Sequence, residues 1–199
     1  MLQVKNISKN FKKNQVLNNI SFQIYPGQIV HIAGRNGSGK STLFKIITHL
    51  IKPTSGTITL DSNVKIGALI ENPGFIEYES ALTNLKFLAN LNNAFDLSTV
   101  SNLMESFYLN PNDNSPVSKY SIGMRQKIGI IQAIMEDQNL ILLDEPTRGL
   151  DPESIEQFVD LLNKLRNQNK SIIIASHDLL PDLKYDATYR LEKGLLVHE

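Results

Sequence analysis

Short apolar runs and amphipathic stretches alternate along most of the chain. Continuous apolar runs predict buried strands, and strict alternation of apolar and polar residues predicts strands with one exposed face. The continuous runs occupy residues 140–143 and 172–175, and residues 28–33 are also predicted to form a buried strand. Further strands are predicted at residues 2–4, 20–24, 57–60, 64–69 and as a pair within 189–197. Strands separated by helices in this way indicate an α/β fold with a mostly parallel sheet covered on both faces.

Apolar residues at spacings of three and four predict the helices. One helix begins at Ser121, a favoured cap residue, and its apolar face is formed by Met124, Ile128, Ile131 and Met135. Another begins at Pro152, because proline fits the first helical position. Residues 77–110 carry apolar side chains at helical spacings among Asn and Ser, which predicts several short helices. We therefore expect one domain over residues 1–199, with a helical insertion at about 77–137.

Composition narrows the functional classes. Twenty basic and twenty acidic residues leave the 199-residue chain with no formal net charge, so no nucleic-acid partner is expected. The chain has no cysteine, which excludes disulfides and thiolate metal sites. Its N-terminus lacks the apolar segment of a secretory signal, and its apolar runs are far shorter than a membrane span. Any membrane part is expected to come from another chain.

A phosphate-binding pattern, G-x-x-x-x-G-K-S/T, lies within residues 34–42, between a predicted strand and a predicted helix. Glycines let the backbone turn sharply and aim successive N–H groups at one anion, and the helix adds its own free N–H groups. Lys40 can reach the β- and γ-phosphates, and the Ser41 hydroxyl can bind Mg²⁺. The expected nucleotide-binding residues of the loop are Gly34, Asn36, Gly37, Ser38, Gly39, Lys40, Ser41 and Thr42.

Chemically active side chains also follow two later strands. Asp144 and Glu145 end one of them, and His177 follows the next. Ligands gather at the carboxyl ends of parallel strands, so we expect these residues to meet the phosphate loop. There Asp144 would hold Mg²⁺, Glu145 would accept a proton from an attacking water, and His177 would contact the γ-phosphate. Of the other histidines, His31 and His49 are expected to be structural and His198 to be exposed.

A second anion site is predicted at Ser121 and Gly123, where a capped helix begins. One nucleotide does not need two phosphate cradles far apart in one chain. Two chains packed head to tail would use both, each closing its second cradle on the ATP of its partner. Near the N-terminus, Phe11 could stack on the nucleobase with Val16 beside the ribose, or could simply pack in the core.

On these residues the chain resembles the ATP-binding cassette of ABC transporters over essentially its whole length. The matching motifs are the Walker A loop at 34–42, the Walker B strand at 140–144, the catalytic glutamate at Glu145, the D-loop at 147–151, the switch histidine at His177 and the adenine-stacking aromatic at Phe11. The resemblance implies a P-loop NTPase fold with antiparallel N-terminal strands and a helical subdomain beside the parallel core. It also implies ATP and Mg²⁺ as cofactors, and ATP hydrolysis with Lys40 in the catalytic centre.

Two segments depart from the general family pattern. The signature Leu-Ser-Gly-Gly-Gln is replaced by Tyr-Ser-Ile-Gly-Met at residues 120–124, which retains Ser121 and Gly123. Glu71 stands where the family has the glutamine of its Q-loop, and we expect this carboxylate to bind the metal. With this substitution the chain is similar to the ATPase subunits of lantibiotic-immunity and bacitracin-resistance exporters.

That resemblance implies a peripheral protein on the cytoplasmic face of the cell membrane, held there by a separately encoded permease. It implies export of an antimicrobial peptide or drug, and pairing either as a homodimer or with a related cassette. The part of the helical insertion at roughly residues 77–120 and the loop at residues 71–75 are the expected docking surface for the permease, with packing of the insertion against the core as the alternative.

Three other functions remain open from the sequence. Soluble ABC ATPases of translation or DNA repair usually carry two cassettes or long coiled-coil insertions, whereas this chain has one cassette and a compact insertion. Small-molecule kinases commonly clamp the transferred phosphoryl group with several arginines, and the five arginines here are scattered. A non-catalytic, nucleotide-gated scaffold is disfavoured by Glu145.

Overall fold

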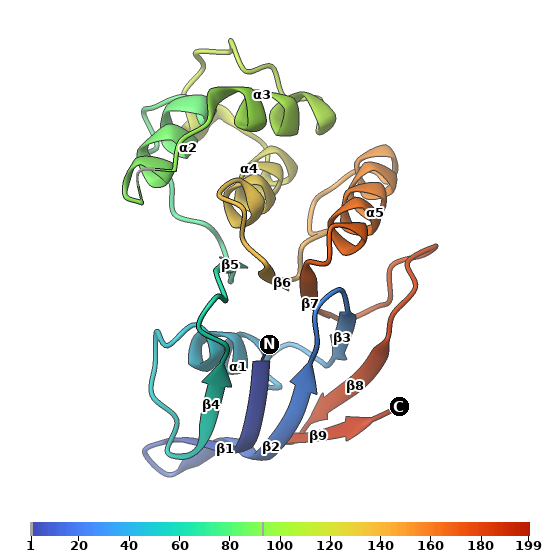
Figure 1. Ribbon diagram of the computed structural model, residues 1–199. Helices are drawn as coiled ribbons and strands as arrows, with labels where there is room; N and C mark the ends of the chain where they lie inside the picture. The colour runs from blue at the N-terminus through green and yellow to red at the C-terminus, as the bar shows by residue number, and fades with distance from the viewer. Residues whose placement is uncertain (1, 93) are drawn as a thin grey trace.

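The computed structural model describes residues 2–92 and 94–199, and its strands form two sheets (Figure 1). The smaller sheet is antiparallel, in the order β2 (Asn14–Ile24), β1 (Leu2–Phe11) and β4 (Ser55–Leu60). The larger sheet has the order β5 (Ile66–Leu69), β6 (Leu140–Asp144), β7 (Ser171–Ser176), β3 (Ile29–Ala33), β8 (Ala187–Glu192) and β9 (Leu195–His198). Its neighbouring strands are parallel except for the β8–β9 pair.

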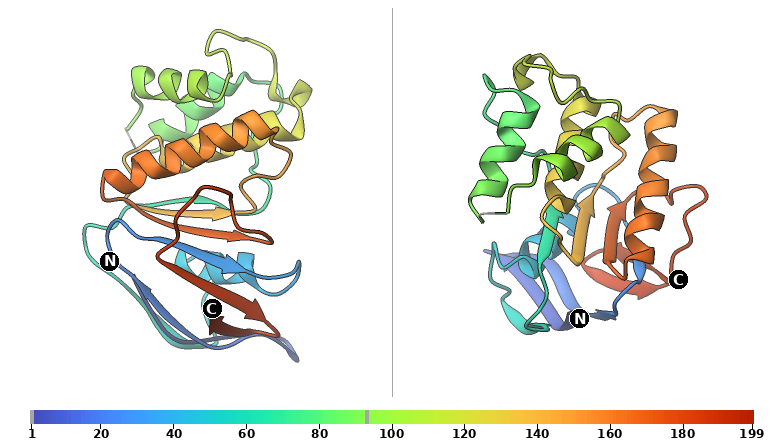
Figure 2. Two further views of the ribbon diagram at one scale, coloured as in Figure 1. Left: turned by 90° about the vertical axis from the view of Figure 1, so that its right-hand side faces the viewer. Right: turned by 45° about the horizontal axis from the view of Figure 1, so that its top comes forward.

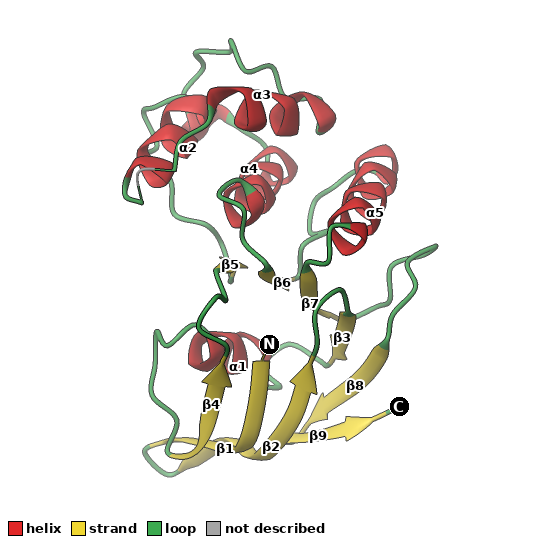
Figure 3. Cartoon of the chain, viewed as in Figure 1, coloured by secondary structure: helices red, strands yellow, loops and turns green. Residues whose placement is uncertain are grey.

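The helices are concentrated between β5 and β7 in the chain (Figure 3). They are α1 (Lys40–Ile47), α2 (Ala81–Asn90), α3 (Leu97–Ser106), the short 3₁₀ helix η1 (Val117–Lys119), α4 (Ile122–Ile134) and α5 (Pro152–Asn167). Within residues 2–92 and 94–199, none of these helices has the length and apolar character needed to cross a bilayer.

Two hydrophobic cores cover the two faces of the larger sheet. Alternate residues of a strand point to opposite faces, so Leu140 and Leu142 join the core around α1 while Ile141 and Leu143 join the core around α2 to α5. Helix α1 therefore lies between the two sheets, and α4 and α5 lie on the opposite face of the larger sheet (Figure 2). Buried on both faces, the central strands need the continuous apolar sequences that predicted them.

Side-chain caps define where the helices of the second core begin. Ser80, Asp96, Ser121 and Asp151 each accept a hydrogen bond from a backbone N–H of the first turn that follows. Caps of this kind stabilise a helix by about 1 kcal/mol, because they satisfy N–H groups that lack a partner in the helix. At α5, Pro152 adds a preset backbone angle to the cap of Asp151.

The predicted α/β class, with its parallel core and antiparallel N-terminal strands, is confirmed. The first two strands are longer than predicted, because β-bulges between Val4 and Asn10 break the alternation that marks a strand in sequence. Helices α2, α3 and α4 fall within residues 77–137. Helix α4 also packs tightly on β5, where a Cβ on Gly67 would lie 1.7 Å from the Ala133 carbonyl oxygen.

Candidate active site

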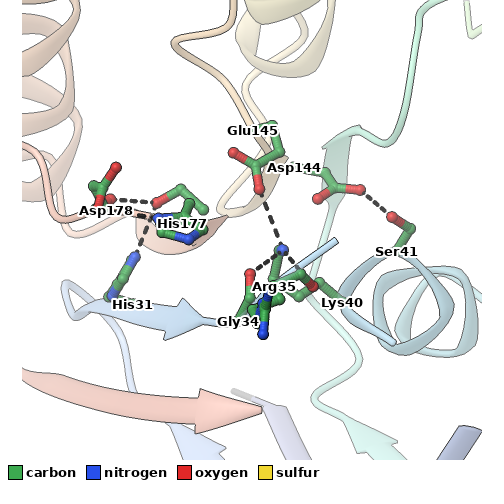
Figure 4. A network of polar contacts seen from close by, with 10 residues as sticks. His31, Gly34, Arg35, Lys40, Ser41, Asp144, Glu145, His177 and Asp178 are labelled. Carbon is green, nitrogen blue, oxygen red and sulfur yellow. Dashed lines mark hydrogen bonds and ion pairs between the residues drawn. The ribbon is translucent and has the colours of Figure 1, made fainter. Parts of the chain in front are cut away.

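Three neighbouring strands end at one edge of the larger sheet. Strand β7 pairs in parallel with β6 on one side and with β3 on the other. Their carboxyl ends lead into the loop at residues 34–39, into Asp144 and Glu145, and into His177. The convergence expected from the sequence is therefore present, and Figure 4 shows the resulting network of polar side chains.

A cavity of about 1030 Å³ opens at this edge. The predicted site residues that line it are Val16, Asn36, Gly37, Gly39, Lys40, Ser41, Thr42, Glu71, Asp144, Glu145 and His177. Four lining residues were not predicted from the sequence, namely Arg35, Asn72, Gln126 and Arg148. The volume lies at the upper end of the range typical of small-molecule sites.

The loop before α1 has the backbone of an anion cradle. Gly37 and Gly39 have φ angles of 81° and 112°, which L side chains rarely adopt. No side chain caps the start of α1 within the described chain, so its first N–H groups are free to face the cavity. There is little room for a side chain at Gly34, because a Cβ there would lie 2.6 Å from the Ser38 hydroxyl oxygen. That hydroxyl is buried and has no hydrogen-bond partner among the described residues.

Lys40 crosses the cavity from α1 towards Glu145. Its ammonium donates a hydrogen bond to the Gly34 carbonyl at 2.6 Å and lies 3.2 Å from Oε1 of Glu145. The two charged groups are close but not aligned for a hydrogen bond. With the Lys40 side chain only 5% exposed, this ion pair offsets part of the cost of burying its charge. A phosphate would offer the same ammonium a stronger partner.

Ser41 and Asp144 form the oxygen-rich side of the cavity. The Ser41 hydroxyl donates a hydrogen bond to Oδ2 of Asp144 at 2.5 Å. Burial raises the pKa of the Asp144 carboxyl, against the opposing effects of the Ser41 hydrogen bond and the nearby Lys40 ammonium. A hydroxyl and a carboxylate side by side are oxygen ligands of the kind that Mg²⁺ prefers, so these two residues fit a magnesium site completed by phosphate oxygens.

Glu71 is oriented differently from the other acidic residues. Its carboxylate accepts a hydrogen bond from Nζ of Lys45 on α1 at 2.6 Å. Its backbone donates a hydrogen bond to the Asp144 carboxylate, and its φ angle of 58° is in the left-handed region. The backbone of Glu71 is thus held beside the metal-type ligands, while its side chain is paired elsewhere. Metal binding by Glu71 stays a prediction.

Glu145 also has a strained backbone, with a φ angle of 47°. Two hydrogen bonds hold it there. Its N–H donates to the Ala175 carbonyl on β7 at 2.8 Å, and its carbonyl accepts from the side-chain amide of Gln126 on α4 at 3.0 Å. Gln126 is 5% exposed, so its amide is desolvated and depends on this contact. The orientation of Glu145 is therefore set jointly by the sheet and by α4.

Of the residues expected to contact the γ-phosphate, the ribose and the base, His177 and Val16 line the cavity and Phe11 does not. The His177 side chain is 69% exposed at the cavity edge, with Nδ1 3.1 Å from the Asp178 carboxylate. Val16 lines the cavity, whereas Phe11 is not among its described lining residues. The Phe11 ring is half-exposed on the β1–β2 hairpin, with the Lys9 ammonium 4.9 Å from its centre. Core packing of Phe11 is thus not what the structure has.

The second predicted cradle lies away from this cavity. Neither Ser121 nor Gly123 is among the described residues that line it. Ser121 is exposed at the start of α4, and Gly123 is buried against the backbone of the D-loop. A Cβ on Gly123 would lie 2.2 Å from the Gly149 carbonyl oxygen, so only glycine fits. Within one chain, Ser121 and Gly123 are therefore separate from the phosphate loop, and anion binding by them stays a prediction.

The unpredicted residues tie neighbouring loops together. The Arg148 guanidinium donates a hydrogen bond to Oδ1 of Asn72 at 3.3 Å, which links the D-loop to the loop after β5. Gln126 and Arg148 lie inside or beside recognised motifs, and Asn72 follows Glu71. Their position next to motif residues is the sequence feature that could have identified them as cavity-lining residues. That signal does not say which neighbours of a motif residue reach the cavity.

Comparisons with known proteins agree with this geometry. A sequence model of the ABC transporter family matches residues 17–148. The lantibiotic transport ATP-binding protein SrtF of Streptococcus pyogenes is 34% identical over 186 residues, which span 90% of this chain and 81% of SrtF. The bacitracin transport ATP-binding protein BcrA of Enterococcus faecalis is 34% identical over 211 residues, which span 100% of this chain and 68% of BcrA.

Solved structures with the same fold include the dimeric bacterial ABC transporter cassette MJ0796. It superposes with a TM-score of 0.87 at 26% sequence identity, covering 98% of this chain and 95% of the cassette. A dimeric, post-hydrolysis structure of the same cassette, bound to ADP and phosphate, matches equally well.

Proposed function

Because this chain belongs to the ABC transporter family, we propose that it is the ATP-hydrolysing subunit that drives a separate membrane permease. The chain is an ABC-type ATPase that binds adenine nucleotide. One observation carries the catalytic proposal: Lys40, Glu145 and His177, from segments that follow three adjacent strands, line one cavity with the phosphate loop. The names of SrtF and BcrA support an exported antimicrobial peptide or drug as the cargo.

In the proposed reaction the phosphate loop and the start of α1 bind the β- and γ-phosphates of ATP. The ammonium of Lys40 moves from Glu145 to the phosphates, which frees the Glu145 carboxylate. Glu145 then accepts a proton from the attacking water, and the imidazole of His177 donates a hydrogen bond to the γ-phosphate. Ser41 and Asp144 would hold Mg²⁺, which when bound supplies positive charge against the phosphate oxygens.

We expect Glu145→Gln to abolish most hydrolysis while sparing ATP binding, because an amide cannot take the proton. Loss of a general base typically lowers the rate by about 10² to 10⁴. The variant should accumulate as an ATP-bound dimer, which size exclusion in Mg²⁺-ATP would detect. Glu153→Gln, on α5 outside the cavity-lining set, is the matched control. Hydrolysis by Glu145→Gln at nearly the wild-type rate would remove Glu145 from this role.

A two-chain active site follows from the position of the second cradle. Ser121 is exposed and away from the cavity of its own chain, and the similar cassette MJ0796 is dimeric. We infer that Ser121 and the N–H groups at the start of α4 contact the nucleotide of a partner chain. The partner would be a second copy of this chain or a related cassette.

Mixing two defective chains tests this arrangement. Ser121→Arg should still bind ATP alone, because its own phosphate loop is intact, and Lys40→Ala should lack that loop's cation. A heterodimer of the two places both defects in one composite site and leaves the other site unmutated. We expect the mixture to hydrolyse ATP faster than either variant alone. No gain on mixing, with heterodimers verified by mass, would contradict independent two-chain sites.

A Mg²⁺ titration of the hydrolysis rate can test whether Glu71 acts on the metal. A carboxylate offers a charged oxygen and no donor, so near the phosphates it repels until a cation intervenes. We expect Glu71→Gln to keep the maximal rate within about tenfold, or ~1.4 kcal/mol of barrier. The Mg²⁺ concentration for half-maximal hydrolysis should rise. Lys45→Met, which releases the Glu71 carboxylate from its ion pair, should lower that concentration. Unchanged midpoints in both variants would show that Glu71 does not act on the metal.

The proposed permease contact lies at the junction between the core and the helical insertion. A groove of about 440 Å³ runs between the end of α1, β5, the loop at residues 70–74 and α4. Leu50 on its rim is 68% exposed, and Tyr78 in the neighbouring segment is 80% exposed. The Arg125 guanidinium forms two hydrogen bonds with the Glu77 carboxylate, which fixes this segment to α4 just beyond Ser121. A partner docked here would respond to the position of α4.

Tyr78 is the better probe of this surface, because Phe75 packs partly against the core of the insertion. We expect Tyr78→Ser to weaken co-purification with the permease while basal ATPase and melting temperature persist. Phe75→Ser should lower both the melting temperature and the yield of complex. Tyr25→Ser, on a turn beside the antiparallel sheet, controls for loss of an exposed tyrosine. Wild-type recovery of the permease by Tyr78→Ser would place the contact elsewhere.

A further inference from the structure

His31 is a buried titratable residue that the proposed reaction does not use. It lies in the middle of β3 and is 1% exposed, between Ile174 of β7 and Thr188 of β8. The other β3 residues on either side are isoleucine, valine and alanine. An imidazole in such surroundings loses its hydration, so its contacts have to account for its presence there.

The hydrogen bonds around His31 determine its tautomer. The Ser176 hydroxyl donates its single hydrogen to the carbonyl of Asp178 at 2.7 Å. The Ser176 hydroxyl can therefore only accept from Nε2 of His31, which lies 2.9 Å away. The proton must be on Nε2, and Nδ1 is left as a bare acceptor without a partner among the described residues. The result is a directed chain from His31 through Ser176 to the backbone of Asp178.

A second contact joins His31 to the far end of the same loop. Its ring packs on the Tyr185 ring, with centroids 5.3 Å apart and an interplanar angle of 53°. The Tyr185 hydroxyl in turn accepts a hydrogen bond from the N–H of Leu180 at 3.1 Å. The segment between β7 and β8, which carries His177 at its start, thus rests on His31 at two points.

Burial favours a neutral imidazole at His31. Burial lowers the pKa of His31, and it outweighs the carboxylates of Glu199, Glu145 and Asp178, which act in the opposite direction. The Lys40 ammonium adds to the lowering. Protonation would also place a hydrogen on Nδ1, where no acceptor is found within the described chain. The neutral form with its proton on Nε2 is the one that the site accommodates.

We propose that His31 is a positioning residue for His177. Its Nε2–H donates a hydrogen bond to the Ser176 hydroxyl, which in turn donates to the Asp178 carbonyl and so stabilises the turn at residues 176–178. This role rests on the proposed contact between His177 and the γ-phosphate. The exposed His177 side chain has only the neighbouring Asp178 carboxylate as a recorded polar partner in the described structure. Its direction therefore depends on the backbone of the turn, and the turn is held by the Ser176 hydroxyl and by His31.

Two substitutions of His31 distinguish the contribution of its hydrogen bond from that of its packing. His31→Leu fills the space without a donor, and His31→Gln retains an N–H donor near the position of Nε2. We expect His31→Leu to lower kcat of ATP hydrolysis by about tenfold, as expected for a barrier change of ~1.4 kcal/mol, with the Kd for ATP unchanged within about twofold. His31→Gln should have a kcat much closer to that of the wild-type protein. His198→Leu, on the exposed β9 of the same sheet, is the histidine control. Equal kcat losses in His31→Leu and His31→Gln would overturn the proposal.

Combination with His177→Ala distinguishes failure of this inference from failure of the proposed function. If His177→Ala alone leaves kcat unchanged, the proposed role of His177 is wrong and the inference falls with it. If His177→Ala lowers kcat but His31→Leu does not, only the role of His31 is wrong. If both lower kcat, His31→Leu should add less than about twofold in the His177→Ala background. A full tenfold additional loss there would show that His31 acts by another route.

The tautomer provides a check that does not depend on activity. In ¹⁵N spectra of the intact protein at neutral pH, the His31 ring should show a protonated Nε2 and an unprotonated Nδ1. Ser176→Ala should change the His31 signals while the ¹⁵N shifts of His198 stay the same. A protonated Nδ1 in the wild-type protein would contradict the hydrogen-bond chain and the proposal.

Discussion

Parallel pairing of β6, β7 and β3 is the constraint from which the active site follows. Adjacent parallel strands present their carboxyl ends at one edge, and nothing in the local sequences alone would bring residues 34, 144 and 177 together. Both faces of this sheet are buried, so the pairing is held by two cores and not by one. The loops at the edge are consequently free to serve chemistry, because the strands beneath them do not depend on the loops for stability.

The two buried charged side chains at this edge, Lys40 and Asp144, already have polar partners within the chain. Lys40 is nearly buried and is paired with Glu145, and Asp144 is nearly buried and accepts from Ser41. Two left-handed backbone positions, at Glu71 and Glu145, add strain that costs about 1 to 3 kcal/mol each. The surrounding hydrogen bonds from Gln126 and to Ala175 hold that strain at Glu145. A site of this kind can exchange internal partners for phosphate oxygens without a large change in the fold.

Much of this could be read from the sequence, and the reasons are physical. The buried strands have continuous apolar runs, the phosphate loop has a glycine spacing that few other structures need, and four helices carry side-chain caps. What could not be read is side-chain direction. Glu71 occupies the expected loop, but its carboxylate turns to Lys45, 26 residues earlier in the chain. Gln126 reaches Glu145, and His31 reaches Ser176, across strands whose contact depends on the tertiary fold. No periodicity or motif spacing encodes such contacts.

Close backbone packing suggests how the nucleotide site is joined to the rest of the molecule. Gly123 leaves no room for a side chain against Gly149, so the start of α4 and the D-loop must move together. A Cβ on Gly129, further along α4, would meet Leu69 and Pro73, so the loop after β5 is in contact with the same helix. Gln126 lies between these two points and contacts the Glu145 carbonyl. Packed elements of this kind respond by shifting as units, because close-packed interiors deform little. A change at Glu145 on ATP binding would therefore reach the exposed Ser121 and the loop after β5 through one helix, α4.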